Sequence, residues 1–450
     1  MKIIVIGGVA AGTSAAAKAS RTAPEAEIIL MERDEDISYA GCGLPYYISG
    51  VTPSRDKLIA NYPGEFEEKY GIEVRTGHEV TEIDPEQKQV KYTDLVNEAC
   101  SQESYDRLII ATGASPVMPP IPGIEMDKIL PLRKVKDGDR IKRLTGDPET
   151  ECVTIVGAGL VGLEMAEAFV ELGLEVTVVE QMQHVLPILP DNLSGELEEH
   201  LINKGVDLIL SDGVKEFQGD EKVEQVITAS GSSIETDLVL MAIGVKPNTK
   251  LAADAGLELG IRDAIRVNSR METSIEDIYA CGDCAETVNI ITGQKTWVPL
   301  GSTANKQGRT AGENAAGGEA EHKGVLKTGI TKVFDYTAAA TGLKAREAEE
   351  AGFDPLTLTL NVPNHAGYYP GFDYFTLHGV FDKKTNRIIG AAGIGESGVN
   401  KRIDVLAGAI YAEQTANDLF QMDLAYAPPY STPKDPVAVL GMVAEKKLHD

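Results

Sequence analysis

Residues 153–180 read VTIVGAGLVGLEMAEAFVELGLEVTVVE and contain the pattern that decides the fold. A short apolar run leads into Gly157, Gly159 and Gly162, which have G-x-G-x-x-G spacing, and a segment of helical propensity follows. A second apolar run ends in Glu180, 18 residues after Gly162. In a strand–turn–helix–strand unit of this kind, the turn and the helix N-terminus receive the phosphates of a dinucleotide, and the acid accepts hydrogen bonds from a ribose. The stretch therefore predicts a dinucleotide-binding unit.

The start of the chain repeats this unit. Residues 3–12 read IIVIGGVAAG, an apolar run with a glycine turn, and a helical segment and a second apolar run come next. The second run ends in Glu32, 20 residues after Gly12. The turn departs from the pattern at Val9, which stands where the middle glycine is expected. One glycine motif is a weak signal, whereas two complete units predict an α/β protein with two Rossmann-like dinucleotide-binding domains.

The acid of the second unit indicates which nicotinamide nucleotide binds. A carboxylate at Glu180 favours the free ribose hydroxyls of NADH, whereas NADPH needs a cationic partner for its 2′-phosphate. Gln181 and Met182, which follow it, carry no positive charge. We therefore expect NADH in preference to NADPH.

Length and charge narrow the possible architectures and partners. The 450 residues predict about two to four domains. With 69 acidic and 42 basic residues the net charge is −27, so neither nucleic acid nor an anionic membrane is expected as a partner. No run reaches the roughly 18 apolar residues of a spanning helix. Five cysteines are too few for a disulfide framework, which favours a reducing, cytoplasmic compartment.

Three further segments are apolar strands that each run into a glycine: LIIATGASP at 108–116, LVLMAIGVKPN at 238–248 and DIYACGDCAE at 277–286. With these segments and its two dinucleotide units, the chain resembles the flavin-dependent pyridine nucleotide–disulfide oxidoreductases. The resemblance implies that the first unit binds FAD and the second binds NAD(P)H. It also implies that Asp283 hydrogen-bonds the ribityl chain of FAD and that NADH lies near Glu164.

Candidate cofactor contacts follow from the two turns and from this resemblance. The residues expected at FAD are Gly7, Val9, Ala11, Gly12, Glu32, Arg33, Val80, Ala111, Thr112, Gly113, Asp283, Thr303 and Ala304. The residues expected at the nicotinamide nucleotide are Gly157, Gly159, Leu160, Val161, Gly162, Glu164, Glu180 and Gly244.

The resemblance also implies the domain boundaries. The FAD-binding domain would be discontinuous, over 1–118 and 250–322, and the NAD(P)H-binding domain over 119–249 would be inserted between its parts. Residues 325–450 are similar to the family's C-terminal α+β interface domain. In that family this domain forms a homodimer and closes the active site across the subunits, so we expect a homodimer.

The segment SYAGCGLPYYISG at 38–50 carries the candidate redox residue, Cys42. Two-cysteine reductases of this family have C-x-x-x-x-C at the flavin, but here the second position is Tyr47. A single thiol accepts two electrons only when a further sulfur or an oxygen is attached to it, as a mixed disulfide, persulfide or sulfenic acid. The second redox atom must then come from the substrate. We expect a lowered pKa at Cys42, because the thiolate is the nucleophile.

A second resemblance indicates which class of substrate accepts the electrons. Single-cysteine NADH oxidases and peroxidases carry a histidine two residues before the last glycine of the first turn, and here that position is Ala10. GGVAAG together with CGLPYY is instead similar to coenzyme A-disulfide reductases and their persulfide- and polysulfide-reducing relatives. Two alternatives remain: an NADH oxidase or peroxidase that uses a Cys42 sulfenic acid, and a redox-sensing flavoprotein with a binding partner.

Two C-terminal segments agree with this resemblance. HAGYYPG at 365–371 and the segment from Tyr426 to 445 are similar to those that bring two tyrosines of the partner subunit to the flavin-side cysteine. The resemblance assigns these roles to Tyr368 and Tyr426, with Tyr369 and Tyr430 as alternatives from the same motifs. A phenol can protonate a departing thiolate.

Coenzyme A would need a basic patch on this acidic protein. Lys18 and Arg21 lie three apart in the first helical segment, hence on one face. Arg21 and Ser38 match residues that contact coenzyme A in the family, and Lys69 falls near a third. Gly41 replaces the asparagine that often precedes the cysteine, which favours a smaller persulfide or polysulfide substrate.

The other cysteines carry weaker signals. Cys281 and Cys284 have C-x-x-C spacing, but there is no second such pair and no histidine nearby. We expect them to pack as small residues. Cys100 and Cys152 lie in no motif, and no metal site is expected.

Overall fold

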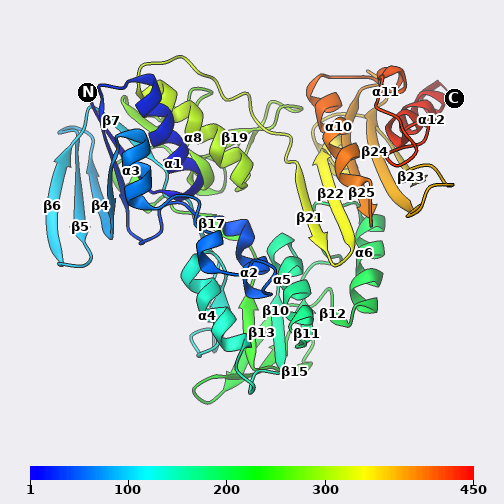
Figure 1. Ribbon diagram of the computed structural model, residues 1–450, viewed down its shortest axis with the longest axis horizontal. Helices are drawn as coiled ribbons and strands as arrows, with labels where there is room; N and C mark the ends of the chain where they lie inside the picture. The colour runs from blue at the N-terminus through cyan, green and yellow to red at the C-terminus, as the bar shows by residue number, and fades with distance from the viewer. Residues whose placement is uncertain (450) are drawn as a thin grey trace.

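The computed structural model describes residues 1–449, which form three lobes (Figure 1). The N-terminal part of the chain and α8 form the lobe at the left of the view, the middle of the chain forms the lobe at the bottom, and the C-terminal part forms the lobe at the right. The chain returns to the first lobe after building the second, because β18 follows every strand of the second sheet but lies in the first sheet.

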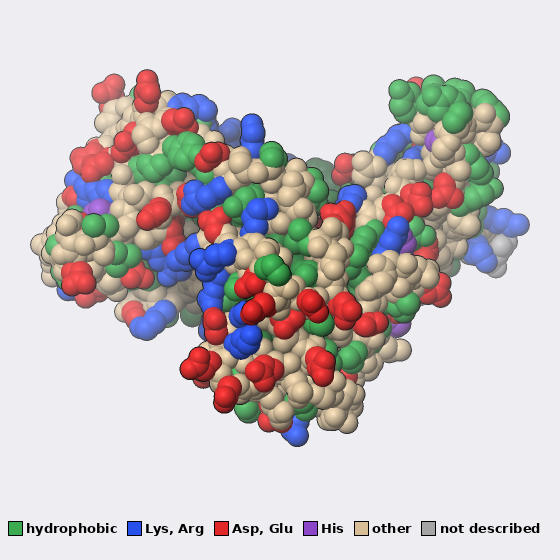
Figure 2. Space-filling model, turned by 60° about the horizontal axis from the view of Figure 1, so that its bottom comes forward, with side chains coloured by type: hydrophobic (Ala, Val, Ile, Leu, Met, Phe, Trp, Pro, Cys, Tyr) green, Lys and Arg blue, Asp and Glu red, His purple; other side chains and the backbone are tan. Residues whose placement is uncertain are grey.

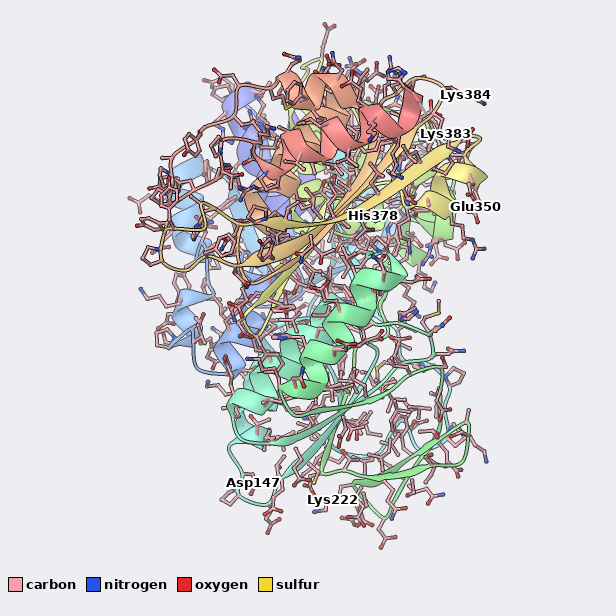
Figure 3. The ribbon with its side chains drawn as sticks, turned by 90° about the vertical axis from the view of Figure 1, so that its right-hand side faces the viewer. Asp147, Lys222, Glu350, His378, Lys383 and Lys384 are labelled. Atoms are coloured by element: carbon pink, nitrogen blue, oxygen red, sulfur yellow. The ribbon has the colours of Figure 1, made fainter. Side chains whose placement is uncertain are left out.

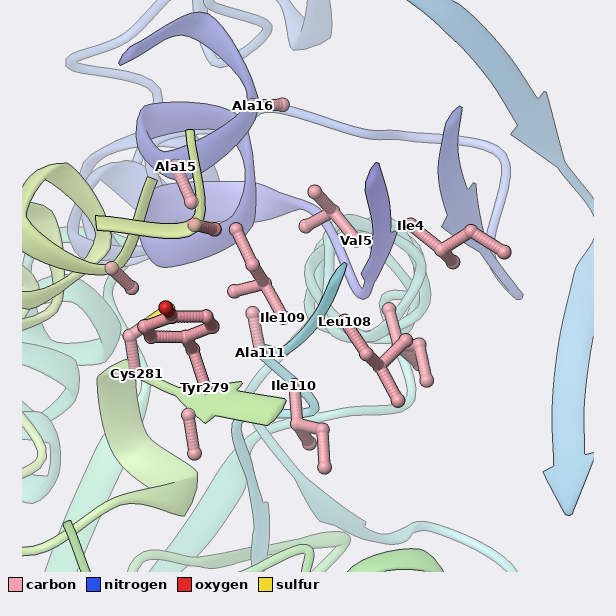
Figure 4. Close-up of a cluster of buried hydrophobic side chains, with 14 of the residues drawn as sticks. Ile4, Val5, Ala15, Ala16, Leu108, Ile109, Ile110, Ala111, Tyr279 and Cys281 are labelled. Carbon is pink, nitrogen blue, oxygen red and sulfur yellow. The ribbon is translucent and has the colours of Figure 1, made fainter. Parts of the chain in front are cut away.

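The first lobe is built on a five-stranded parallel sheet in the order β18-β7-β1-β2-β3. Its central strands are apolar runs buried on both faces, as in a doubly wound sheet. Ile4 of β1, for example, lies between Ile29 and Leu108. Figure 4 shows this core, in which Ile109 and Tyr279 belong to adjacent strands. The strands are β1 (Lys2–Ile6), β2 (Glu27–Glu32), β3 (Glu73–Thr76), β7 (Arg107–Ile110) and β18 (Ile278–Ala280).

Two helices of the first lobe pack side by side (Figure 1). They are α1 (Val9–Thr22), which begins at the glycine turn after β1, and α8 (Gly301–Ala315). A Cβ atom at Gly308 or Gly312 would overlap the backbone carbonyl of Ala11 or Ala15, so glycine is needed for this close packing. The lobe also contains α3 (Pro63–Tyr70), α7 (Lys250–Asp254), β19 (Thr287–Val288), β20 (Lys295–Thr296) and an antiparallel sheet of β4 (His78–Asp84), β5 (Gln89–Asp94) and β6 (Ala99–Ser104). The short helix α2 (Leu44–Ile48) instead packs against helices of the second lobe (Figure 1).

The second lobe repeats the design of the first. Its parallel sheet has the order β12-β11-β10-β16-β9, and the predicted α/β class with two Rossmann-like sheets is confirmed. The chain crosses between the lobes through β8 (Ala114–Pro116) and β17 (Val245–Pro247), which pair with each other. The elements are β9 (Ile129–Pro131), α4 (Val135–Thr145), β10 (Cys152–Val156), α5 (Leu160–Glu171), β11 (Glu175–Val179), α6 (Asp191–Asn203), β12 (Val206–Ile209), β13 (Val214–Gly219), β14 (Val223–Thr228), β15 (Ser233–Glu235) and β16 (Leu238–Met241).

The third lobe is an antiparallel sheet covered by helices. The strand order is β21-β22-β25-β24-β23, and Figure 3 shows α12 lying across this sheet, with His378 on one of its strands above α6. Thr376 donates to Glu196 of α6 at 2.8 Å, which joins the second and third lobes. The elements are β21 (Gly329–Val333), β22 (Tyr336–Gly342), α9 (Ala345–Glu350), β23 (Pro355–Pro363), β24 (Tyr374–Asp382), β25 (Ile388–Gly395), α10 (Val399–Tyr411), α11 (Ala416–Gln421) and α12 (Pro436–His449).

Charged groups cover the surface and join the lobes. Figure 2 shows acidic side chains on all three lobes and a band of Lys and Arg where the first and second lobes meet. Lys134 approaches Asp34 at 2.5 Å, and Arg55 approaches Asp139 at 3.3 Å, so ion pairs bridge this junction. Within residues 1–449, no helix combines the length and the apolar character that crossing a bilayer requires.

Candidate active site around Cys42

The glycine turns of the first two lobes have the geometry of a phosphate cradle. Gly7 and Gly157 have φ values of 96° and 107°, which favour glycine. A Cβ atom at Gly12 or Gly162 would overlap the carbonyl oxygen of the glycine that opens its own turn. The spacing therefore exists because the helix must pass directly over the turn, which places the helix N-terminus where a phosphate can bind.

The two predicted acids lie beside these turns. Glu32 accepts a hydrogen bond from the backbone N–H of Gly8 at 2.7 Å, and Glu180 accepts one from Ala158 at 2.7 Å. Each carboxylate is thus held at the end of one strand, next to the turn that follows the neighbouring strand. Both units fit a dinucleotide, with phosphates at the turn and a ribose at the acid.

The departure at Val9 has a structural consequence. Val9 adopts φ of 55°, in the left-handed region that β-branched residues avoid. The equivalent Gly159 has φ of −82°, so the two turns differ in conformation at this position. Val9 is one of several residues other than glycine with positive φ, and it places backbone strain at the first predicted phosphate turn.

Cys42 lies in a 3₁₀ turn over Gly41–Gly43 that leads directly into α2. The residue is exposed, whereas Leu44 and Tyr47 on α2 are buried against α4 and α5 of the second lobe. Tyr47 donates a hydrogen bond to Asp139 at 2.9 Å. The position of the second cysteine of two-cysteine reductases is therefore occupied by a side chain that joins the lobes.

The electrostatic surroundings of Cys42 differ from the expectation. Loss of hydration raises the pKa of the Cys42 thiol, and the negative charges of Glu164 and Asp283 raise it further, although Arg133 opposes them. The expected lowering of this pKa is wrong for the chain by itself, because desolvation and two carboxylates outweigh one guanidinium.

Arg133 was not found by sequence reasoning. It precedes α4 in the second lobe and donates to Asp283 of the first lobe at 2.6 Å. The backbone carbonyl of Asp283 also accepts a hydrogen bond from the Trp297 indole at 2.9 Å. Asp283 is therefore held from two sides, and no local motif around Arg133 reveals this contact.

Glu164 lies on α5 between the second and third lobes. Its carboxylate accepts a hydrogen bond from Thr331 at 3.0 Å, and burial raises its pKa. Next to it a cleft of about 460 Å³ opens. The cleft is lined by Tyr46, Glu164, Ile330, Thr331, Lys332, Thr337, Glu396, Ser397, Gly398 and Asn400.

The structure brings Tyr368 and Tyr426 together. Both side chains are exposed, and a hydrogen bond to Tyr368 raises the pKa of Tyr426. Tyr369 instead packs its ring edge against His365 with centroids 5.6 Å apart, and Tyr430 is 68% exposed. The tyrosine pair belongs to the third lobe, whereas Cys42 precedes α2 at the junction of the other two lobes (Figure 1).

Of the four candidate coenzyme A contacts, only two share a neighbour. Arg21 and Lys69 both lie over the ring of Tyr70, at 5.5 and 5.2 Å from its centroid. Lys18 instead forms an ion pair with Glu313 of α8 at 3.0 Å. Ser38 is buried and accepts a hydrogen bond from Asn61 at 3.4 Å.

Some of the remaining candidates lie near the first turn, and two of the cysteines are buried. A Cβ atom at Gly282, next to Asp283, would lie 2.6 Å from the side chain of Ala11 and 3.6 Å from that of Ala304, so these segments converge. Cys281 and Cys284 are fully buried, and burial raises the pKa of both thiols. Among residues 1–449 no cluster of His, Cys, Asp and Glu could hold a metal ion.

Comparison with known proteins identifies the family. Residues 1–308 match the family described as "Pyridine nucleotide-disulphide oxidoreductase", and residues 329–436 match its dimerisation domain. The chain belongs to this family. It is therefore an FAD-dependent oxidoreductase of the pyridine nucleotide–disulfide class, and the expected family, enzyme class and fold are confirmed.

Several relatives within the family are similar to this chain over most of their length. The chain is 38% identical to the "NAD(P)H sulfur oxidoreductase (CoA-dependent)" of Pyrococcus abyssi, over 98% of this chain and 97% of the relative. It is 35% identical to an "NADH oxidase" of Methanocaldococcus jannaschii, over 100% and 99%. The solved persulfide reductase of A. fulgidus has 41% identity and a TM-score of 0.97, over 99% of this chain and 83% of that chain.

Because the pKa of Cys42 is raised, this pyridine nucleotide–disulfide oxidoreductase should react with alkylating agents only at high pH. Only the thiolate reacts, so the rate for iodoacetamide at Cys42 in the reduced protein should have its midpoint above the ordinary thiol pKa. Glu164→Gln removes a negative charge and should lower this midpoint. The measurement is mass spectrometry of the Cys42 peptide from about pH 7 to about pH 11.

The matched control for this titration is Glu171→Gln. Glu171 is exposed at the other end of α5, so its loss should leave the midpoint of Cys42 unchanged. A midpoint below the ordinary thiol value in the unsubstituted protein contradicts the electrostatic account, as does an equal shift in both variants.

Proposed function

We propose that this chain is an NADH-dependent reductase of coenzyme A disulfide, coenzyme A persulfide or polysulfide, which acts through Cys42. The supporting observation is the single exposed thiol at Cys42, with Tyr47 in place of a second cysteine and turned to Asp139. A mixed disulfide or persulfide with the substrate is then the form in which this thiol accepts two electrons. The name of the Pyrococcus abyssi relative supports the same substrate class.

The reaction we propose has two steps at sulfur. The Cys42 thiolate attacks one sulfur of the substrate R–S–S–R′, the S–S bond breaks, and R′S⁻ leaves with a Cys42–S–S–R mixed disulfide behind. Two electrons then cleave this disulfide, which releases RS⁻ and restores the Cys42 thiolate. FAD, when bound, takes hydride from NADH and supplies these two electrons.

The proposed cofactor positions use the two cradles. The turn of Gly7 and Gly12 would hold the phosphates of FAD, Glu32 would hold a ribose, and Asp283 would hold the ribityl chain. The second turn would hold the phosphates of NADH, with Glu180 at a ribose and Glu164 near the nicotinamide. The carboxylate at Glu180 supports NADH over NADPH, because it would repel a 2′-phosphate.

The tyrosine pair acts as the proposed proton donor. In a homodimer formed through the third lobe, Tyr368 and Tyr426 of one subunit face Cys42 of the other. Burial is small at these phenols, so the hydrogen bond between them is the cause of the raised pKa of Tyr426. A phenol with a raised pKa stays protonated and can stabilise or protonate the departing thiolate.

Coenzyme A substrates use Arg21 and Lys69 in this proposal. Both cations lie over the Tyr70 ring and form a local positive site on a chain of net charge −27. Such a site suits the phosphates of the adenosine end. Lys18 contributes less, because Glu313 neutralises it.

Charge reversal at this positive site should distinguish the substrates. In the Arg21→Glu/Lys69→Glu protein, KM for coenzyme A disulfide should rise by at least about tenfold. KM for inorganic polysulfide should stay unchanged, because polysulfide carries no adenosine phosphates. Steady-state NADH oxidation with each acceptor measures both values. Arg143→Glu, an exposed cation of α4, is the control, and equal losses for both acceptors remove coenzyme A from the Arg21 and Lys69 site.

The substrate class is tested by the adduct on Cys42. Protein purified without reductant and denatured in acid should carry coenzyme A or sulfane sulfur on the Cys42 peptide, which intact and peptide masses identify. The rival function is an NADH oxidase, favoured by the name of the Methanocaldococcus jannaschii relative and opposed by Ala10, which offers no proton donor. A sulfenic acid as the only adduct, with O₂ consumed faster than disulfides, selects the oxidase and overturns the proposal.

A further inference from the structure

Arg402 is a fully buried cation outside the cleft described above. It lies on α10, its side chain is 2% exposed, and its charge meets that of Asp435, which is 5% exposed, at 3.1 Å. Its guanidinium also lies over the ring of Phe375, 5.6 Å from the centroid. A buried ion pair contributes little net stability compared with apolar packing, so its presence here calls for another reason.

The guanidinium connects both segments that carry the tyrosine pair. Nη2 of Arg402 lies 3.1 Å from the carbonyl oxygen of Asn364, which precedes the Tyr368 segment. The same nitrogen lies 3.3 Å from the carbonyl oxygen of Tyr430 and 3.3 Å from the hydroxyl of Ser431, which follow Tyr426. One side chain therefore contacts two loops that are more than fifty residues apart in the sequence, as the numbering shows.

The two loops also form a backbone hydrogen bond with each other. The backbone N–H of Ala366 donates to the carbonyl of Pro428 at 3.2 Å. Asn364 fixes the first loop from within, because its amide donates to the Gly371 carbonyl at 3.0 Å and its oxygen accepts from the Asp373 N–H at 3.0 Å. Beyond these anchors the phenols themselves are exposed, so their approach to each other depends on how the loops are held.

The second loop is anchored through Asp435, the acidic partner of Arg402. Ser431 donates to Asp435 at 2.7 Å, and Asp435 accepts from the backbone N–H of Val437 at the start of α12. A planar guanidinium can meet several acceptors at fixed angles, whereas a lysine ammonium is a point charge with three donors on a flexible stem. Arginine is thus the side chain that can serve both loops at once.

We propose that Arg402 is a positioning residue that holds the Tyr368 and Tyr426 loops in register, so that the two phenols act together on the departing thiolate at Cys42 of the other subunit. The inference rests on the proposed function for its catalytic consequence. Arg402 itself touches neither substrate nor cofactor in this scheme. Its effect reaches the reaction through the geometry of the tyrosine pair.

The test compares Arg402→Lys with the unsubstituted holoenzyme. In Arg402→Lys, kcat for coenzyme A disulfide should fall at least about tenfold, whereas the rate at which NADH reduces the flavin should not change. The alkaline limb of the kcat profile should move to lower pH, because Tyr426 loses the partner that raises its pKa. A general loss of stability would not produce this separation of half-reactions or this shift.

Two further variants keep the test decisive. Arg387→Lys in the same lobe affects an exposed ion pair with Glu413 and should leave every readout unchanged. Where Arg402→Lys does not fold, Ser431→Ala removes one hydroxyl from the anchor of the second loop and should move the alkaline limb in the same direction. The inference is overturned if a folded Arg402→Lys protein has the kcat and the alkaline limb of the unsubstituted enzyme. Where Arg402→Lys does not fold, the same result in Ser431→Ala overturns it.

Failure of the proposed function is distinguishable from failure of the inference. If the unsubstituted enzyme reduces no sulfur acceptor, the function fails, but the phenolate absorbance of the enzyme still reports Tyr426. The difference titration between the Arg402→Lys and unsubstituted proteins should show one phenol that ionises earlier, and this difference should vanish in a Tyr426→Phe background. If the two titrations do not differ, Arg402 does not position the tyrosine pair, and the inference fails.

Discussion

Replacing Cys42 by serine should abolish the turnover of coenzyme A disulfide and polysulfide, with kcat/KM lower by at least about a thousandfold. Serine cannot form the mixed disulfide that the reaction requires, and its hydroxyl is a far weaker nucleophile at neutral pH. The fold should be unaffected, because Cys42 is exposed in a short 3₁₀ turn. NADH should therefore still reduce the bound flavin at the unsubstituted rate, which stopped-flow absorbance measures.

The matched control is Cys100→Ser. Cys100 is exposed on β6, in an antiparallel sheet of the first lobe, and lies in no candidate site. Its loss should leave both half-reactions unchanged. Retained disulfide turnover in Cys42→Ser would mean that another group accepts the electrons, and the mechanism at Cys42 would have to be abandoned.

The features that sequence predicted well are local ones. The turns at Gly12 and Gly162 require glycine because each helix passes over the carbonyl of its own turn, and this constraint acts within a few residues. The acids Glu32 and Glu180 follow at similar spacing, because one helix and one strand separate each of them from its turn. A linear pattern records such constraints directly.

The features that sequence missed depend on contacts between distant segments. Arg133 meets Asp283 across the lobe junction although 150 positions separate them. The pKa of Cys42 depends on three charges from separate segments, so a rule about reactive thiols predicted the wrong direction. The resemblance assigned roles to Tyr368 and Tyr426, but the proximity of the two phenols and the shared anchor of their loops at Arg402 follow only from the fold.

Alanine substitutions in the two glycine turns should each weaken the binding of a different cofactor. In Gly12→Ala the new Cβ atom overlaps the Gly7 carbonyl, so the first turn must open. We expect a loss of about 3 kcal/mol in the free energy of unfolding and at least about a tenfold drop in bound FAD. In Gly162→Ala the second turn opens in the same way, so bound FAD should stay constant while KM for NADH rises at least about tenfold.

Gly195→Ala in α6 is the control for both variants, because a Cβ atom there meets nothing within 4 Å and alanine favours a helix interior. Flavin absorbance per chain, chemical denaturation and KM for NADH provide the readouts. Both turns carry a dinucleotide-binding pattern, so the flavin content of the two variants tests which turn binds FAD. If Gly162→Ala loses flavin and Gly12→Ala retains it, the FAD and NADH sites are the reverse of those proposed. The hydride would then enter from the side of Glu32, and the proposed role of Glu164 near the nicotinamide would fail with the assignment.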